Sequence, residues 1–87
     1  MDLDVVRYVI RRRLEGGLLP QGRMMKVKDT SGGGQMCDAC GANITEDQGA
    51  MVGATLEGGR RTRHFHALCF RIWDNERHLL LLDRRSA

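Results

Sequence analysis

The sequence predicts a small α+β domain, and three patterns along the chain support this prediction. Apolar residues recur at helical spacing near the N-terminus, over residues 2–15. Two runs, 50–56 and 60–66, have the composition of strands and flank a glycine-containing turn. A second helical pattern begins at about residue 66. The length of 87 residues allows one small domain rather than two.

The first predicted element is an amphipathic helix over residues 2–15. Its apolar face carries Leu3, Val6, Ile10 and Leu14. Asp2 or Asp4 can cap the N-terminus, where a negative charge complements the helix dipole. Gly16-Gly17 then ends the helix, because glycine tolerates the left-handed conformation of a C-cap.

Composition divides the chain into four predicted segments. Residues 28–35 contain three consecutive glycines and offer no face that could be buried, which is typical of a flexible linker. The segments are an N-terminal helix with its connection (1–27), a flexible glycine-rich linker (28–36), a module that contains all three cysteines (37–82) and a tail (83–87).

Two strands are expected inside the module, over 50–56 and 60–66. Between them lies Glu57-Gly58-Gly59, whose glycines supply the positive φ of a tight hairpin turn. Val52, Ala54 and Leu56 alternate along the first strand and form its expected apolar face. The helix that follows carries a roughly helical apolar stripe from Leu68 to Leu80.

A chain of this size and composition usually needs a metal, disulfides or a partner chain to be stable. Only 5% of the residues are aromatic, and the 11 glycines raise the entropy cost of folding. Three cysteines cannot all form disulfides with one another, and the acidic start Met1–Asp4 does not resemble a secretory signal. We therefore expect a reducing, cytoplasmic location and cysteines that bind metal, although a nucleoid or nuclear location fits equally well.

Four residues form two matched half-sites for that metal. Cys37-Asp-Ala-Cys40-Gly41 can fold into a zinc knuckle, in which the glycine permits the turn. His66-Ala-Leu-Cys69 places its two donors on one face of a first helical turn. Three sulfurs and one nitrogen suit a single tetrahedral, structural Zn²⁺. The predicted ligands are therefore Cys37, Cys40, His66 and Cys69.

Other interpretations explain these residues less completely. His64 lies on the same side of the strand as His66 and is the alternative ligand. A redox Cys-x-x-Cys pair belongs to a βαβ unit, which the pattern lacks. A Cys37–Cys40 disulfide would leave His66 and Cys69 unexplained, and four protein ligands leave no open position for catalysis. We therefore expect no enzymatic activity and no small-molecule substrate.

The ligand order, together with Phe70 and Trp73, resembles the zinc fingers of poly(ADP-ribose) polymerases. The resemblance covers residues 37–73 and extends to short bacterial proteins with the same Cys-x-x-Cys-Gly and His-x-x-Cys-Phe-x-x-Trp arrangement. It implies a single finger in which Phe70 and Trp73 pack beside the metal. The polymerase fingers recognise DNA ends, so the resemblance also implies DNA binding. LIM domains begin similarly, but their second ligand set has no counterpart here.

Two partner classes are expected from charge and apolar pattern. The net charge is +3, and basic residues exceed acidic ones in residues 1–27. The candidate phosphate contacts are Arg60, Arg61 and Arg63 of the second strand and Arg11, Arg12 and Arg13 of the first helix. The alternative is a protein partner or self-association through the apolar stripes of the two helices. The longest apolar run, Leu79–Leu82, is too short to span a membrane.

Overall fold

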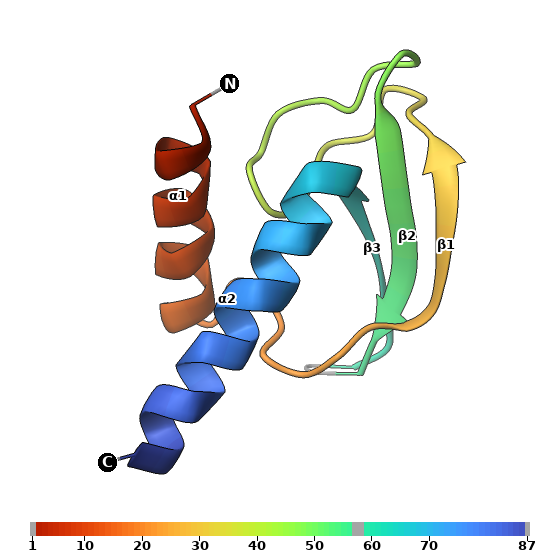
Figure 1. The fold of residues 1–87 in the computed structure, drawn as a ribbon. Coiled ribbons are helices and arrows are strands. Elements are labelled where there is room, and N and C mark those ends of the chain that lie inside the picture. Colours follow the sequence, from red (N-terminus) through yellow and green to blue (C-terminus); the bar gives the residue numbers. More distant parts are fainter. Residues whose placement is uncertain (1, 57–58, 87) are drawn as a thin grey trace.

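The fold combines two helices with a three-stranded antiparallel sheet (Figure 1). The computed structural model describes residues 2–56 and 59–86, and side chains of the last helix through Asp83. The elements are α1 (Leu3–Glu15), β1 (Met25–Ser31), β2 (Gly49–Thr55), β3 (Arg61–His66) and α2 (Ala67–Ser86). The predicted α+β class, both helices and both predicted strands are therefore confirmed.

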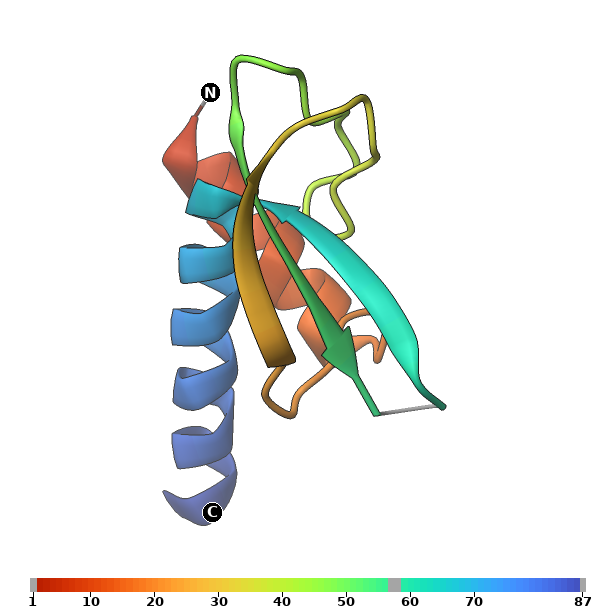
Figure 2. The same cartoon turned by 90° about the vertical axis from the view of Figure 1, so that its right-hand side faces the viewer.

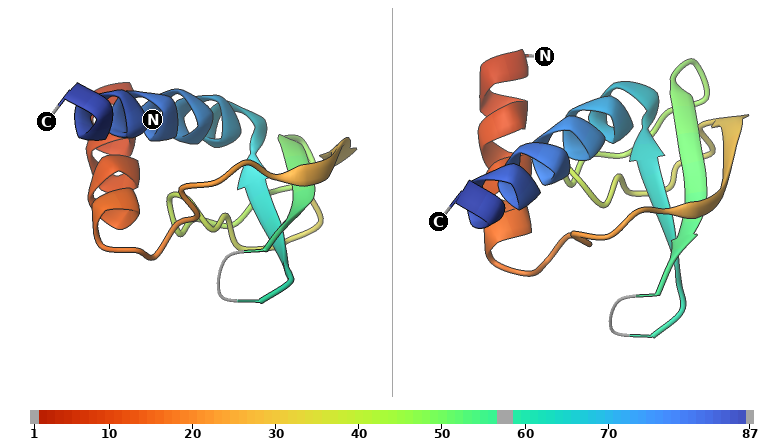
Figure 3. Two further views of the ribbon diagram at one scale, coloured as in Figure 1. Left: turned by 90° about the horizontal axis from the view of Figure 1, so that it is seen from below. Right: turned by 60° about the horizontal axis from the view of Figure 1, so that its bottom comes forward.

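Both helices lie on the same side of the sheet (Figures 1 and 3). The strand order is β1-β2-β3, so β2 is central and pairs antiparallel with each neighbour. The helix α2 continues directly from β3 and packs against both the sheet and α1. The N-terminal and C-terminal helices therefore pack together in one unit.

The helix α1 forms as the sequence predicts. The Asp2 carboxylate caps it by accepting a hydrogen bond from the backbone N–H of Asp4, at 3.0 Å. Three of its four predicted apolar residues, Val6, Ile10 and Leu14, are buried, whereas Leu3 remains exposed at the start of the helix. The apolar face of α1 is thus buried against other parts of the same chain.

The expected linker over 28–36 is wrong in its first part, because residues 28–31 belong to β1. Lys28 to Ser31 pair with Val52 to Gly49 of β2, after an irregularity near Lys26, whose φ is +54°. All seven residues of β1 are exposed, so the strand is held by backbone pairing and has no buried face. This explains why periodicity could not reveal it.

The glycine that follows β1 serves close packing. Gly32 is buried, and a Cβ built there would overlap the carbonyl oxygens of Ile44 and Thr45. Its backbone N–H donates to the carbonyl of Gln48 at 3.0 Å. This glycine therefore allows the connection between β1 and β2 to fold back on itself.

The β2–β3 hairpin has the predicted extent to within one residue, but its buried face is different. Phe65 pairs with Met51 and is fully buried, so the face that includes these two residues packs toward α2. Of the expected apolar face, Val52 and Ala54 are half-buried and Leu56 is 63% exposed. The predicted turn falls on residues 57 and 58, which lie outside the described residues.

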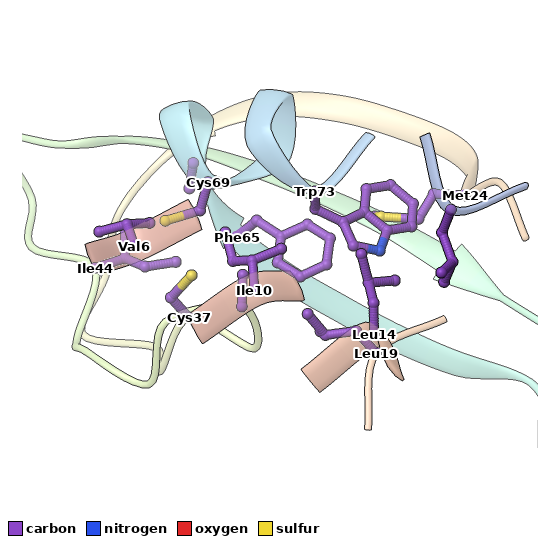
Figure 4. Packing of buried hydrophobic residues seen from close by; sticks show 13 residues of the cluster. Val6, Ile10, Leu14, Leu19, Met24, Cys37, Ile44, Phe65, Cys69 and Trp73 are labelled. Carbon is purple, nitrogen blue, oxygen red and sulfur yellow. The ribbon is translucent and has the colours of Figure 1, made fainter. Parts of the chain in front are cut away.

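One hydrophobic core joins all the elements except β1 (Figure 4). The rings of Phe65, Phe70 and Trp73 stack in tilted contacts, with centroids 5.3–6.2 Å apart. The Trp73 indole N–H donates to the carbonyl of Pro20 at 2.9 Å, which fastens the connection after α1. Phe70 and Trp73 therefore have the packing roles that the family resemblance implies.

The helix α2 is longer than expected, since residues 83–86 continue it and do not form a tail. Asp83 accepts a 3.0 Å hydrogen bond from Arg11, which links the far end of α2 to α1. Within the described part of the chain, neither helix has the length and hydropathy needed to cross a membrane.

The close approach at Gly32 gives a direct test of the fold. Changing Gly32→Ala should lower the free energy of unfolding by about 1–3 kcal/mol, because the new methyl group forces two backbone carbonyls apart. Chemical denaturation of metal-loaded protein measures the effect. Gly33→Ala is the matched control, since its Cβ would lie 3.5 Å from the Gln35 side chain, an ordinary contact. Equal stabilities of the two variants would contradict this packing.

Candidate metal centre

The first half of the site is a tight turn between β1 and β2. The backbone N–H of Cys37 donates to the carbonyl of Ala42, and the N–H of Gly41 donates to the carbonyl of Cys37, both at 2.8 Å. Gly41 has φ +83°, a conformation that glycine adopts without strain. The turn brings the side chains of Cys37 and Cys40 to one side.

The second half of the site lies where β3 passes into α2. His66 is the last residue of the strand, and Cys69 lies in the first turn of the helix. Asp38 fastens the two halves together. Its backbone N–H donates to the carbonyl of His64 at 2.8 Å, and its carboxylate accepts from the N–H of His64 at 2.9 Å.

These contacts gather Cys37, Cys40, His66 and Cys69, whose candidate ligand atoms all lie within 4.8 Å of one another. Nδ1 of His66 lies 3.4 Å from Sγ of Cys40 and 3.7 Å from Sγ of Cys69. A tetrahedral zinc with ordinary bond lengths places sulfur and nitrogen about 3.5 Å apart. The group could therefore hold one metal ion, and its size is compatible with zinc.

Hydrogen bonds fix the orientation of the His66 ring. Its Nε2 lies 3.2 Å from the carbonyl oxygen of Asn43 and 3.1 Å from Oε1 of Gln48. Both partners are acceptors, so Nε2 carries the proton and the lone pair of Nδ1 faces the sulfurs. This arrangement is common for metal-bound histidine, in which the second ring nitrogen donates to a protein oxygen.

His64, the alternative ligand, is not part of the group that the described residues form. Its backbone pairs with Asp38, and its side chain is half-buried. The geometry therefore favours His66, which the helical spacing to Cys69 also indicated.

The three thiols shift one another's ionisation. The pKa of Cys37 falls to about 4, chiefly because the Cys69 thiol hydrogen-bonds to its sulfur. Burial raises the pKa of Cys40. The pKa of Cys69 is raised by its hydrogen bond to Cys37, by burial, and by repulsion from the other two sulfurs. The cluster thus stabilises one thiolate and opposes further negative charge, an imbalance that a bound cation relieves.

Apolar side chains of α1 lie in the same packed cluster as Cys37 and Cys69 (Figure 4). Val6 and Ile10 belong to the same buried core as Cys37 and Cys69, both of which have no exposed surface. Arg13 adds a polar link, since its Nη1 donates to the carbonyl of Asp38 at 3.2 Å. The site is therefore enclosed, with only Cys40 half-exposed among the four residues.

The six arginines named as candidate phosphate contacts have different environments. Arg11 bonds to Asp83, and Arg13 bonds to the turn that carries Cys37 and Cys40. Arg63 is half-buried, with a buried Nε. The side chains exposed to solvent are Arg12, Arg60 and Arg61.

Sequence reasoning missed the residues that support the ligands. Gln48 and Asn43 position His66, and Asp38 joins the turn to β3. Asparagine, glutamine and aspartate are common in surface loops, and the Asn43 contact uses only a backbone carbonyl. No spacing rule in the sequence could have identified them.

The chain was compared with protein-family models, curated proteins and solved structures, and none of them matches it. The likeness to poly(ADP-ribose) polymerase fingers and to short bacterial zinc-finger proteins therefore depends on the motif alone. The finger type remains a hypothesis.

Metal affinity should fall steeply as the pH is lowered. We expect the metal-free chain to unfold over residues 37–82, so its three thiols have ordinary pKa values of about 8.5 and keep their protons below that pH. Binding then displaces about three protons, so the zinc Kd should rise by up to about 1000-fold for each unit of pH lost between pH 8 and 6. Chelator competition at several pH values measures this slope. A Kd that does not change with pH would contradict the assignment of the thiols.

The support of His66 by Gln48 can be tested by mutation. Changing Gln48→Ala removes one acceptor from Nε2 and should weaken zinc binding by about 10-fold, the lower end of the usual range for such partners. Chelator competition at fixed pH measures the Kd. Gln35→Ala is the matched control, because this amide accepts a hydrogen bond from Gly33 and lies outside the group of four. Equal losses in both variants would argue against a specific role for Gln48.

Proposed function

We propose that this chain is a non-enzymatic zinc module, in which Cys37, Cys40, His66 and Cys69 hold one structural Zn²⁺. The enclosed group of three sulfurs and one oriented Nδ1 supports the proposal most strongly. Zinc is the favoured ion because thiolate and imidazole donors in a tetrahedral arrangement suit it best among divalent metals. The order and spacing of the four residues also agree with a finger of the polymerase type.

The absence of enzymatic activity is part of the proposal. A catalytic zinc keeps one coordination position for water or substrate. Here four protein donors would fill a tetrahedral shell, and two of the three sulfurs are fully buried. Zinc would then join the turn to the helix and contribute to folding.

We favour another protein as the binding partner of this zinc module. Several large apolar side chains of both helices are exposed, including Tyr8 at 65% and Leu82 at 56%. At the same time, Arg11 and Arg13 have internal hydrogen bonds, which leaves fewer cations of α1 to meet phosphates. Exposed apolar area of this kind is typical of surfaces that bind other proteins.

Nucleic acid is the second candidate, supported by the exposed cations at the start of β3. Arg60 and Arg61 are neighbours there and are both exposed. The motif likeness to fingers that bind DNA ends points to the same partner class. A DNA duplex with a nick or an end would be the expected ligand.

Removal of the metal tests the zinc proposal. Excess chelator should unfold residues 37–82, because structural zinc contributes on the order of 10–16 kcal/mol in small modules and the apolar core is small. Circular dichroism or NMR measures the loss of structure, and elemental analysis should give one zinc per chain beforehand.

Substitution of the two histidines tests the ligand set. His66→Ala should abolish zinc retention, whereas the His64→Ala variant should retain zinc. A folded spectrum in chelator, or zinc loss in the His64 variant alone, would contradict the proposal.

A salt titration tests the nucleic-acid candidate. Zinc-loaded protein should bind nicked duplex DNA at low salt and weaken steeply as salt rises, if arginines contact phosphates. Arg60→Gln with Arg61→Gln should reduce the slope of log K against log salt by about two. Arg7→Gln is the matched control, because Arg7 is exposed on α1 and is not among the candidate phosphate contacts. An absence of binding at low salt would remove this candidate.

A further inference from the structure

The helix α2 carries two parallel stripes, one buried and one open. The buried stripe consists of Cys69, Trp73, Glu76 and Leu80. One residue earlier in each turn lies a second stripe, defined by Leu68, Ile72, Asn75, Leu79 and Leu82. We call these five residues the outer stripe. Their spacing of four, three, four and three residues is that of a coiled-coil seam.

The outer stripe is accessible in the folded chain. Leu68 and Leu79 are each 43% exposed, Leu82 is 56% exposed, and Ile72 is partly buried against the core. The C-terminal end of α2 extends past the end of the sheet (Figure 2). A second helix could pack along this part of α2.

The order of residues in the outer stripe is symmetric about Asn75. Leu68 and Leu82 lie seven residues to either side of it, and Ile72 and Leu79 lie three and four residues away. Two identical helices packed antiparallel with Asn75 at the centre would therefore place apolar residues opposite apolar residues on both sides of the asparagine pair. A two-fold interface requires this kind of self-complementary surface.

We propose that a second copy of this chain docks antiparallel on the outer stripe. In this arrangement Leu68 meets the second copy's Leu82, Ile72 meets its Leu79, and the two Asn75 amides hydrogen-bond on the axis. A single asparagine in an apolar seam sets the register of such pairs. The inference rests on the proposed function, because it names the protein partner of the zinc module.

A hollow beside the metal centre fits this occupant. A pocket of about 390 Å³ opens next to Leu68 and is also lined by Gln48, Gly49, His66 and Ala67. Antiparallel docking brings the second copy's Leu82 to Leu68, and thus to the mouth of this pocket. Because His66 and Gln48 form one wall, the dimer surface depends on an intact zinc site.

The outer stripe contains no charged residue, so the association should resist salt. Sedimentation equilibrium of the zinc-loaded full chain, at 0.15 M and 1 M salt, should show a monomer–dimer equilibrium with similar Kd values. Leu79→Glu with Leu82→Glu should raise the dimer Kd by at least about 100-fold, since two charges replace buried leucines. The matched control is Leu18→Glu, at a leucine that is 69% exposed and lies outside the stripe.

Thiol cross-linking tests the orientation. A mixture of Leu68→Cys and Leu82→Cys chains, treated with a short bismaleimide, should give a cross-linked dimer. The Leu68→Cys chain alone should not, because antiparallel packing separates its two copies by about 21 Å along the axis. The chain without an added cysteine is the control for reaction at the zinc ligands. Efficient cross-linking of Leu68→Cys with itself would indicate a parallel pair and overturn the proposal.

The remaining outcomes separate this inference from the function on which it rests. A monomer at all concentrations, with one zinc per chain, overturns the dimer and leaves the zinc module in place. A dimer that the two glutamate substitutions do not weaken overturns the assignment of the surface. Loss of zinc from the unmodified chain would instead overturn the proposed function itself.

Discussion

The structure depends on bringing two pairs of donors together from distant parts of the sequence. Cys40 and His66 are 26 residues apart in the sequence, yet Sγ of Cys40 lies 3.4 Å from Nδ1 of His66. Three sulfurs and an imidazole at this spacing oppose further ionisation of the thiols, so the arrangement is favourable only when protons or a cation compensate it. The surrounding fold supplies backbone hydrogen bonds and apolar packing that hold the groups in place.

The metal centre and the hydrophobic core form one unit. Cys37 and Cys69 are core residues as well as candidate ligands, and α1 packs on them with Val6 and Ile10. A contact that fixes the turn, such as the one between Arg13 and Asp38, therefore also fixes α1. For this reason we expect zinc loss to affect the N-terminal helix as well as the finger.

The parts of the fold with strong local patterns could be predicted from the sequence. The two helices have clear periodicity, the β2–β3 hairpin has two strand-like runs around a glycine-containing turn, and the two half-sites of the metal centre have characteristic spacings. The strand β1 could not be predicted, because none of its residues is buried and pairing with β2 alone defines it. Its glycine-rich end suggested flexibility, whereas Gly32 is buried where two segments of backbone meet.

The support of the site also lay beyond sequence reasoning. Gln48 and Asn43 reach His66 only because the connection after β1 folds back over the start of α2. The surface roles of the arginines could not be read from the charge pattern, since Arg11 and Arg13 find partners far along the chain. Long-range contacts of this kind leave no periodic signal.

X-ray absorption at the zinc edge tests the central claim most directly. Zinc-loaded protein should show three sulfur neighbours at about 2.3 Å and one nitrogen neighbour at about 2.0–2.1 Å. The nitrogen signal should carry the outer-shell scattering of an imidazole ring. A shell with two sulfurs, or one with a water oxygen in the fourth position, would contradict a closed site made of Cys37, Cys40, His66 and Cys69.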